Sequence, residues 1–275
     1  MNSDSEYPIP NRPEHFALNV AAPLAMVEWY TRNLQMKVKR QGGPPTHTTF
    51  IGDVTGNIML ELFCNTNFPM LDLRQLHPMT LHLAIMTDDI AGTKRALLEV
   101  GAAVAEDITK IPTGDKVLMM RDPWGFALQF VQRSSPMLVQ THFRAEHVAF
   151  NVSDSRAQAQ WHQTHFGMRV KREGGAPTFG MFIADTNEHM MLELYQNSQH
   201  PMLDLPKVSY MAVHIASMVP DVALTRKKLL AVGATIAEDL TTTPGGDTIL
   251  MLRDPWGLPI QFVKRVESML EPRGE

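Results

Sequence analysis

The sequence predicts an α+β fold of four β-α-β-β-β modules, arranged as a tandem duplication. The segment RDPWGFALQFVQR at 121–133 returns as RDPWGLPIQFVKR at 253–265, an offset of 253 − 121 = 132 residues. Residues 14–133 align on 146–265 without a gap, with roughly half of the positions identical. A repeat of this length has the size of a domain and is too long for a solenoid unit, so a domain has been duplicated.

The limits of the repeat divide the chain into five parts. These are an N-terminal tail (1–13), a first domain (14–133), a linker (134–145), a second domain (146–265) and a C-terminal tail (266–275). The linker SSPMLVQTHFRA is short. We therefore expect the two halves to pack together and not to swing on a tether.

Each copy opens with the pattern of one β-α-β-β-β module. HFALNV alternates apolar and polar residues as a strand does, and the segment after it has apolar residues at helical spacing. Three more strands are expected before the next loop, one ending at a Gly-Gly turn and two joined by a turn at 53–56. The predicted elements are strand 15–20, helix 22–34, and strands 36–43, 47–53 and 57–64.

The pattern then starts again after a loop rich in Pro, Asp and Met. LHLAIM at 81–86 is a strand, and Asp88 or Asp89 can cap a helix that ends at Gly101. Three further strands are expected at 102–107, 116–122 and 126–132, the last two joined by the DPWG turn. Each copy therefore holds two modules, and the chain holds four.

Composition indicates an ordinary soluble globular protein. Hydrophobic residues make up 44% of the chain and its net charge is −4, which gives no reason to expect nucleic acid or a membrane as a partner. The N-terminal segment is polar and proline-rich, without the apolar core of a signal peptide, and no segment is long enough to span a bilayer. Cys64 is the only cysteine, which excludes an internal disulfide and favours a cytoplasmic location.

Four strands of each copy carry one polar side chain on a face that is otherwise small or apolar. Because side chains alternate along a strand, the opposite face of each of these strands is aliphatic. A sheet face of this kind is expected to line a cavity. The polar residues are His15, Glu61, His82 and Gln129 in the first copy, and His147, Glu193, His214 and Gln261 in the second.

The histidines test whether this set has a function, because a lone strand histidine is usually a hydrogen-bonded core or surface residue. Of the 11 histidines, only the pairs His15/His147 and His82/His214 recur in register. The His162-x-x-His165 pair has no counterpart in the first copy and is expected to be solvated. Two imidazoles, a carboxylate and a carboxamide suit Zn, Ni, Co, Mn or Fe(II), with substrate oxygens completing the coordination.

These features together resemble the vicinal oxygen chelate superfamily. The resemblance is carried by the paired modules, the first-strand His, the Glu of MLEL (59–62), the His of LHLAI (81–85) and the DPWG turn (122–125). The superfamily includes glyoxalase I, extradiol dioxygenases, methylmalonyl-CoA epimerase, and fosfomycin- and bleomycin-resistance proteins. The resemblance implies tandem glyoxalase-like domains whose curved mixed sheets surround cavities.

The resemblance also implies that the eight polar residues are metal ligands, but it leaves their pairing open. The ligands meet either within one copy or across the two, with His15 and Glu61 joined by His214 and Gln261. Crossed pairing would replace a homodimer whose sites lie between subunits. The chain itself is expected to be a monomer or a homodimer.

The last-strand glutamines depart from glyoxalase I, where a Glu at this place can also act as the base. A carboxamide cannot accept a proton at neutral pH. Glu61 and Glu193 are therefore the predicted catalytic bases, and Asn19 and Asn151, on the cavity face, are predicted substrate contacts. We expect a metal-dependent enzyme of lyase or isomerase type acting on a small substrate with vicinal oxygens. The alternatives are an Fe(II) extradiol-type dioxygenase and a non-catalytic antibiotic-binding resistance protein.

Overall fold

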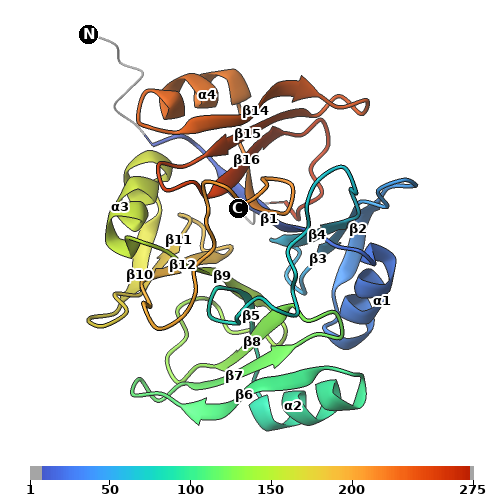
Figure 1. The fold of residues 1–275 in the computed structure, drawn as a ribbon, viewed down its shortest axis with the longest axis vertical. Coiled ribbons are helices and arrows are strands. Elements are labelled where there is room, and N and C mark those ends of the chain that lie inside the picture. Colours follow the sequence, from blue (N-terminus) through green and yellow to red (C-terminus); the bar gives the residue numbers. More distant parts are fainter. Residues whose placement is uncertain (1–7, 273–275) are drawn as a thin grey trace.

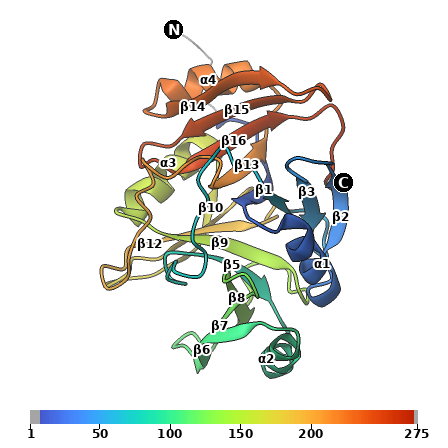
Figure 2. The same cartoon turned by 45° about the vertical axis from the view of Figure 1, so that its right-hand side comes forward.

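The computed structural model describes residues 8–272, in which two mixed sheets of eight strands are flanked by four helices (Figures 1 and 2). The remaining parts of the predicted tails, residues 1–7 and 273–275, lie outside the described residues. None of the helices in the described part of the chain is long and apolar enough to cross a membrane.

All four predicted β-α-β-β-β modules are present, and every element predicted for the first copy is confirmed. Module 1 is β1 (Arg12–Asn19), α1 (Pro23–Asn33), β2 (Lys37–Gln41), β3 (Thr49–Gly52) and β4 (Met59–Phe63). Module 2 is β5 (Leu81–Met86), α2 (Ile90–Glu99), β6 (Ala103–Lys110), β7 (Lys116–Arg121) and β8 (Ala127–Gln132). Module 3 is β9 (Ala145–Asn151), α3 (Ser155–Phe166), β10 (Arg169–Glu173), β11 (Met181–Ala184) and β12 (Met191–Tyr195). Module 4 is β13 (Val213–Met218), α4 (Val222–Leu230), β14 (Thr235–Thr242), β15 (Thr248–Arg253) and β16 (Pro259–Lys264).

The repeated DPWG segment is a tight turn that delivers the last strand of a module. In the first copy, Asp122 Oδ1 accepts hydrogen bonds from the backbone N–H groups of Trp124 at 3.0 Å and Phe126 at 2.9 Å. Gly125 has φ +100°, and a Cβ there would lie 2.8 Å from the Cα of Arg74. Both the backbone conformation and the close approach therefore require glycine. The same turn recurs at 254–257.

The sheets are built across the two copies. The first sheet has the order β14-β15-β16-β13-β1-β4-β3-β2, so it joins module 1 to module 4. The second has the order β10-β11-β12-β9-β5-β8-β7-β6, so it joins module 2 to module 3. Antiparallel pairing of β1 with β13 and of β5 with β9 makes each junction. Of the two pairings that the sequence leaves open, the structure has the crossed one.

Modules of the same copy contact each other through helices and turns. Trp29 of α1 donates its indole N–H to the carbonyl of Val100, which caps α2, at 2.9 Å. Tyr30 donates its hydroxyl to Asp122 of the first DPWG turn at 2.9 Å. Trp161 repeats the first contact with Val232 at 3.0 Å. Each copy is thus joined by its helical layer, while its sheets continue into the other copy.

The prediction that His162 is solvated is wrong. His162 is 2% exposed, and its Nε2 lies 3.3 Å from Asp254 of the second DPWG turn. It occupies the place of Tyr30 in the first copy, since 162 − 132 = 30. The aromatic role recurs while the residue type does not, so a search for matching histidines could not detect it.

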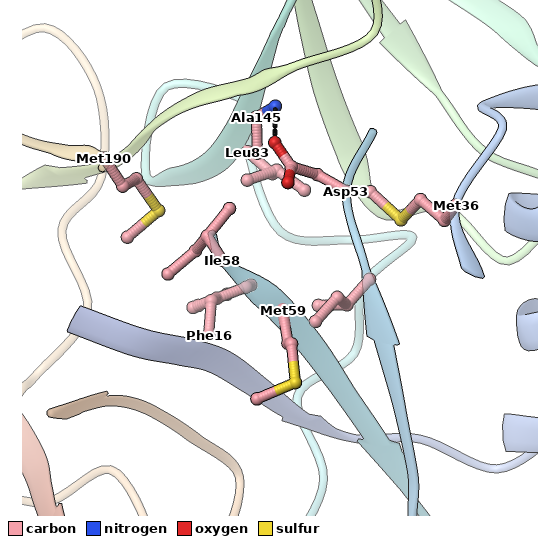
Figure 3. Close-up of a pocket in the computed structure, with 9 residues that line it drawn as sticks. Phe16, Met36, Asp53, Ile58, Met59, Leu83, Ala145 and Met190 are labelled. Carbon is pink, nitrogen blue, oxygen red and sulfur yellow. Dashed lines mark hydrogen bonds between the residues drawn. The ribbon is translucent and has the colours of Figure 1, made fainter. Parts of the chain in front are cut away.

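The aliphatic strand faces of both sheets contribute to one shared core. Between the sheets lies a cavity of about 10 Å³, bounded by Phe16 and Ile58 on one side and by Leu83 and Met190 on the other (Figure 3). Asp53 in its wall accepts a hydrogen bond from the backbone N–H of Ala145 at 3.1 Å. A space of this size holds about one water, so it is a packing defect and no ligand site.

The C-terminal tail and the linker continue the repeat beyond its predicted ends. Met137 and Leu138 of the linker match Met269 and Leu270 of the tail at the same offset of 132. Leu138 is 3% exposed and Leu270 is 6% exposed. Leu270 packs with Phe50 and Met59 on the polar-bearing face of the first sheet. Both segments therefore close one end of a sheet with apolar side chains.

We expect Leu270→Ala to lower the free energy of unfolding by about 2–4 kcal/mol, because it leaves a cavity in this cluster. Val266→Ala is the matched control, since Val266 lies in the same tail and is 73% exposed. The control should change the free energy by less than about 0.5 kcal/mol. Urea unfolding of the full chain measures both. Equal midpoints for the two variants would show that the tail adds nothing to the core.

Candidate metal centres

The strand register brings the predicted ligands of the first sheet into two neighbouring rows. Ala17 of β1 is paired with Glu61 of β4 on one side and with His214 of β13 on the other. In the next row, His15 is followed by Ala216 of β13 and then by Gln261 of β16. All of these side chains project from the face opposite the aliphatic one, because positions two apart share a face.

The second sheet repeats this arrangement with its partners exchanged. Ala149 of β9 lies between Glu193 and His82. His147 is followed by Ala84 and Gln129. Each sheet thus gathers two histidines, one glutamate and one glutamine, and each set draws on both copies.

The ligand atoms of the first triad lie at the spacing of atoms around one ion. His15 Nε2 is 3.1 Å from Glu61 Oε2, and His214 Nε2 is 3.5 Å from the same oxygen. Metal–ligand bonds of about 2.0–2.2 Å place neighbouring ligand atoms roughly 3–3.5 Å apart. All three donor atoms fall within 4.8 Å of one another. The geometry therefore suits a single bound ion.

The second triad has nearly the same dimensions. His147 Nε2 is 3.1 Å and His82 Nε2 is 3.7 Å from Glu193 Oε2. The three side chains are buried or nearly so, with Glu193 15% exposed. The two sheets therefore offer two separate centres for the same kind of ion.

Buried polar atoms without partners supply an independent test of fit. Among the described residues, the Nε2 atoms of all four histidines and Oε2 of Glu61 are buried and make no hydrogen bond of good geometry, although within each triad the Nε2 atoms lie 3.1 to 3.7 Å from the carboxylate oxygen. Each unsatisfied buried polar atom costs about 1–3 kcal/mol, so a cluster of them needs a compensating partner. A divalent cation is a partner that neutral imidazole and carboxylate atoms can all bind at once. The residues present therefore fit a divalent first-row ion.

The other ring nitrogen of each histidine has a hydrogen-bond acceptor. His15 Nδ1 donates to Glu14 at 2.9 Å, and His147 Nδ1 donates to Glu146 at 2.8 Å. His214 and His82 donate instead to the carbonyls of residues 210 and 78, at 2.9 and 3.1 Å. Carboxylates and carbonyls only accept, so Nδ1 carries the proton and the lone pair of a neutral ring lies on Nε2, toward the triad.

Burial and neighbouring charges shift the pKa values of these groups. Burial alone would raise the pKa of Glu14, but hydrogen bonds from Arg265 and His15 lower it to about 2. Burial lowers the pKa of His82 to about 4, although Glu193 opposes this. For His15, the charges of Glu61 and Glu14 outweigh burial and raise the pKa. Burial would raise the pKa of Glu61, but the charges and hydrogen bonds of His15 and His214 outweigh burial and lower it.

Charged residues beside the first triad form a chain in which all members except Arg40 are buried. Arg265 donates to both oxygens of Glu14, at 2.8 and 2.6 Å, and its third contact is Asp247 at 2.9 Å. Arg40 also reaches Asp247, at 3.1 Å. The second triad is backed in the same way by Glu146, Arg133, Asp115 and Arg172. Sequence reasoning missed the glutamates, the aspartates and the pair Arg133/Arg265 of these chains, although their positions recur at the offset of 132.

The predicted glutamine ligands lie beside the triads. Gln261 is in the row of His15 but two strands away, and Gln129 stands in the same relation to His147. Both are partly exposed, and neither side chain makes a hydrogen bond to any of residues 8–272. Their carboxamides stay available for an ion or a substrate, and their role as ligands stays a prediction.

The predicted substrate contacts Asn19 and Asn151 are engaged with the loops that follow β4 and β12. Asn19 donates to the carbonyl of Asn65 at 2.9 Å and accepts from its N–H at 2.8 Å. Asn151 makes the equivalent contacts with Asn197 at 3.0 and 2.7 Å. Their contact with substrate stays a prediction, and in the structure these amides hold the loops at the ends of the sheets.

A cleft of about 500 Å³ opens above the first triad. Of the three triad residues, Glu61 is the one that lines it. Module 1 adds Arg40, Thr48 and Phe50 to the walls, and module 4 adds Ile249 among others. The cleft is large enough for a small molecule, and its lining combines charged and polar side chains with Phe50 and Ile249.

The fold and its paired centres define a class of protein. The chain matches the Glyoxalase/Bleomycin resistance protein/Dioxygenase superfamily model twice, over residues 12–130 and 144–262. The chain therefore belongs to this superfamily, as a tandem duplication. A comparison with curated protein sequences found no match.

Solved structures share the fold over nearly the whole chain. Glyoxalase I from Zea mays superposes with a TM-score of 0.70 at 20% identity, covering 92% of each chain. Its V278E mutant gives 0.71 at 19% identity, again with 92% of each chain covered. A putative dioxygenase from Bacillus subtilis gives 0.66 at 11% identity, covering 96% of this chain and 88% of the other. At these identities the likeness extends to the fold alone.

Proposed function

We propose that this protein is a metal-dependent, glyoxalase-like enzyme of lyase or isomerase type, acting on a small substrate with oxygens on adjacent carbons. The observation that carries the proposal is the pair of buried triads, in which the Nε2 atoms converge on one carboxylate oxygen without a hydrogen bond of good geometry while every Nδ1 is engaged. Cytoplasmic location and a site complete within one chain, as a monomer or in a homodimer, are part of this proposal.

The residues of the first centre have distinct tasks in this reaction. His15, Glu61 and His214 would hold the ion, and Gln261, in the row of His15 but two strands away, would bind or orient the substrate. A bound divalent ion supplies Lewis acidity to a substrate carbonyl oxygen. Glu61 lines the cleft, and its carboxylate would take a proton from the hydroxyl-bearing carbon beside that carbonyl and return it to the carbonyl carbon, while the hydroxyl proton passes to the carbonyl oxygen.

Apolar residues close the ion-facing end of the same site. The ring of Phe50 lies edge-on to His15, with centroids 5.2 Å apart, and Met59 and Leu270 pack beside it. Phe50 also lines the cleft, so these side chains form an apolar part of the wall beside the triad. Gln261 carries no basic atom, so proton transfer falls to Glu61 in this centre and to Glu193 in the other.

Removal of the metal tests the proposal. Protein purified without a chelator is expected to contain close to two divalent ions per chain by elemental analysis. The assay is proton exchange at the α-carbon of α-hydroxy ketones such as hydroxyacetone, measured by NMR in D₂O. Treatment with a chelator should abolish this exchange, and adding back one of the candidate divalent metals should restore it. Tight binding of a small molecule with no turnover under any metal would favour the antibiotic-binding alternative instead.

A second candidate function is an Fe(II) ring-cleaving dioxygenase. The observation that favours it is the two-His-one-carboxylate set in each centre, which is the ligand set of many non-haem Fe(II) oxygenases. Oxygen uptake with catechol after anaerobic loading with Fe(II) tests it. Consumption of oxygen with Fe(II), and no exchange activity with Zn or Ni, would replace the first candidate by this one.

A further inference from the structure

The two histidines of each triad are supported in different ways. His214 and His82 each donate to a backbone carbonyl, which is neutral. His15 and His147 each donate to a fully buried carboxylate, Glu14 or Glu146. A negative charge behind an imidazole makes its other nitrogen a stronger electron donor. The two ligands of one ion are therefore not equivalent.

A β-bulge explains how Glu14 reaches its neighbour. Consecutive residues on a regular strand point to opposite faces, so Glu14 would point away from His15. The pairing of β1 with β13 skips one residue between Pro13 and His15, which makes Glu14 the extra residue of a bulge. A bulge re-aims side chains and is frequent beside functional sites. The same skip occurs at Glu146, between Ala145 and His147.

The carboxylate is itself held from the other copy. Arg265, 251 residues further along the chain, follows β16 of module 4 and donates to both oxygens of Glu14. The Arg265 side chain is 4% exposed and the Glu14 side chain is fully buried. Asp247 fixes the remaining arm of Arg265 at 2.9 Å. This pair can form only when modules 1 and 4 are docked.

We propose that Glu14–Arg265 and Glu146–Arg133 are positioning pairs. Each pair orients one histidine of its centre and makes its Nε2 a stronger electron donor, and thereby ties metal affinity to the docking of the two copies. The proposal rests on the proposed function, since it requires that the triads bind an ion. Arg265 also lines the cleft of the first centre. The carboxylates of the pairs bond to His15 and His147, and through these histidines they act on the ion sites.

The test compares the two centres within one molecule. In the full chain, Glu14→Gln is expected to weaken one of the two divalent-ion sites by about 10- to 100-fold and to leave the other at wild-type affinity. Glu146→Gln should do the same to the other site. Zn²⁺ dissociation constants come from competition with a chromophoric chelator, and the visible spectrum of Co²⁺ reports the ligand geometry.

Variants of Arg265 provide a second test of the first pair. Arg265→Gln is expected to weaken the first centre as Glu14→Gln does, whereas Arg265→Lys, which keeps a cation beside Glu14, should restore most of the affinity. Because both residues act through one chain of contacts, the double variant Glu14→Gln/Arg265→Gln should lose less than the sum of the single losses. Removing one member of a buried pair also destabilises the fold, so Arg265→Lys serves as the milder variant.

Glu271→Gln is the matched control. It removes the carboxylate of another ion pair between the tail and module 1, Lys39–Glu271 at 2.7 Å, which is half-exposed and touches no histidine. The Glu271→Gln variant should bind both ions with wild-type affinity. Unchanged affinity at both centres in Glu14→Gln would overturn the inference, and so would equal weakening of both centres, which marks a general loss of structure. A wild-type chain that binds no ion would instead overturn the proposed function.

Discussion

The double variant His15→Ala/His82→Ala is expected to bind no divalent ion tightly, whereas His15→Ala/His214→Ala keeps one ion per chain. The first pair of substitutions removes one ligand from each sheet, because His15 and His82 belong to the same copy but to different centres. The second pair removes two ligands from one centre and leaves His82, His147 and Glu193 intact. Elemental analysis of the purified variants measures the stoichiometry.

This comparison separates crossed pairing from pairing within a copy, since the two arrangements predict opposite results from the same number of lost histidines. His77→Ala/His200→Ala is the matched control. These two rings stack on each other with centroids 4.3 Å apart and belong to neither triad. The control should keep two ions. One ion in His15→Ala/His82→Ala and none in His15→Ala/His214→Ala would contradict the crossed centres.

The second large effect is expected from the triad glutamates. Glu61→Gln/Glu193→Gln should lower the turnover number about 10²- to 10⁴-fold, because a carboxamide keeps the shape and an oxygen ligand but cannot accept a proton. Glu61→Gln alone should leave turnover at the second centre unchanged. Proton exchange at the α-carbon of hydroxyacetone gives the rate, and elemental analysis shows whether the ions remain.

Glu267→Gln provides the control for this pair, since Glu267 lines the same cleft as Glu61 but lies outside the triad. Its turnover should equal that of the wild type. Full turnover in Glu61→Gln/Glu193→Gln, with both ions bound, would exclude these glutamates as the bases. Loss of the ions together with turnover would show that the carboxylate charge is needed first for binding.

Much of the candidate site was predictable because its signals are local. Alternation along a strand places Glu61 and Leu60 on opposite faces, so the apolar and polar faces follow from neighbouring residues alone. Glu14 was not predictable by the same rule, because a bulge in the pairing with β13 turns it toward His15. Its recurrence as Glu146 is a usable signal, but strict alternation would place both residues on the aliphatic face.

The sequence by itself determined the duplication, the four modules, and the polar residues that share a strand face. Only the tertiary structure decided that His15 and Glu61 meet His214 and not His82. The reason is physical. The alternation of apolar and polar residues depends on neighbours within one strand, whereas the pairing of β1 with β13 or β5 depends on how distant modules dock. All four modules carry the same pattern of faces, so the sequence satisfies both pairings equally well.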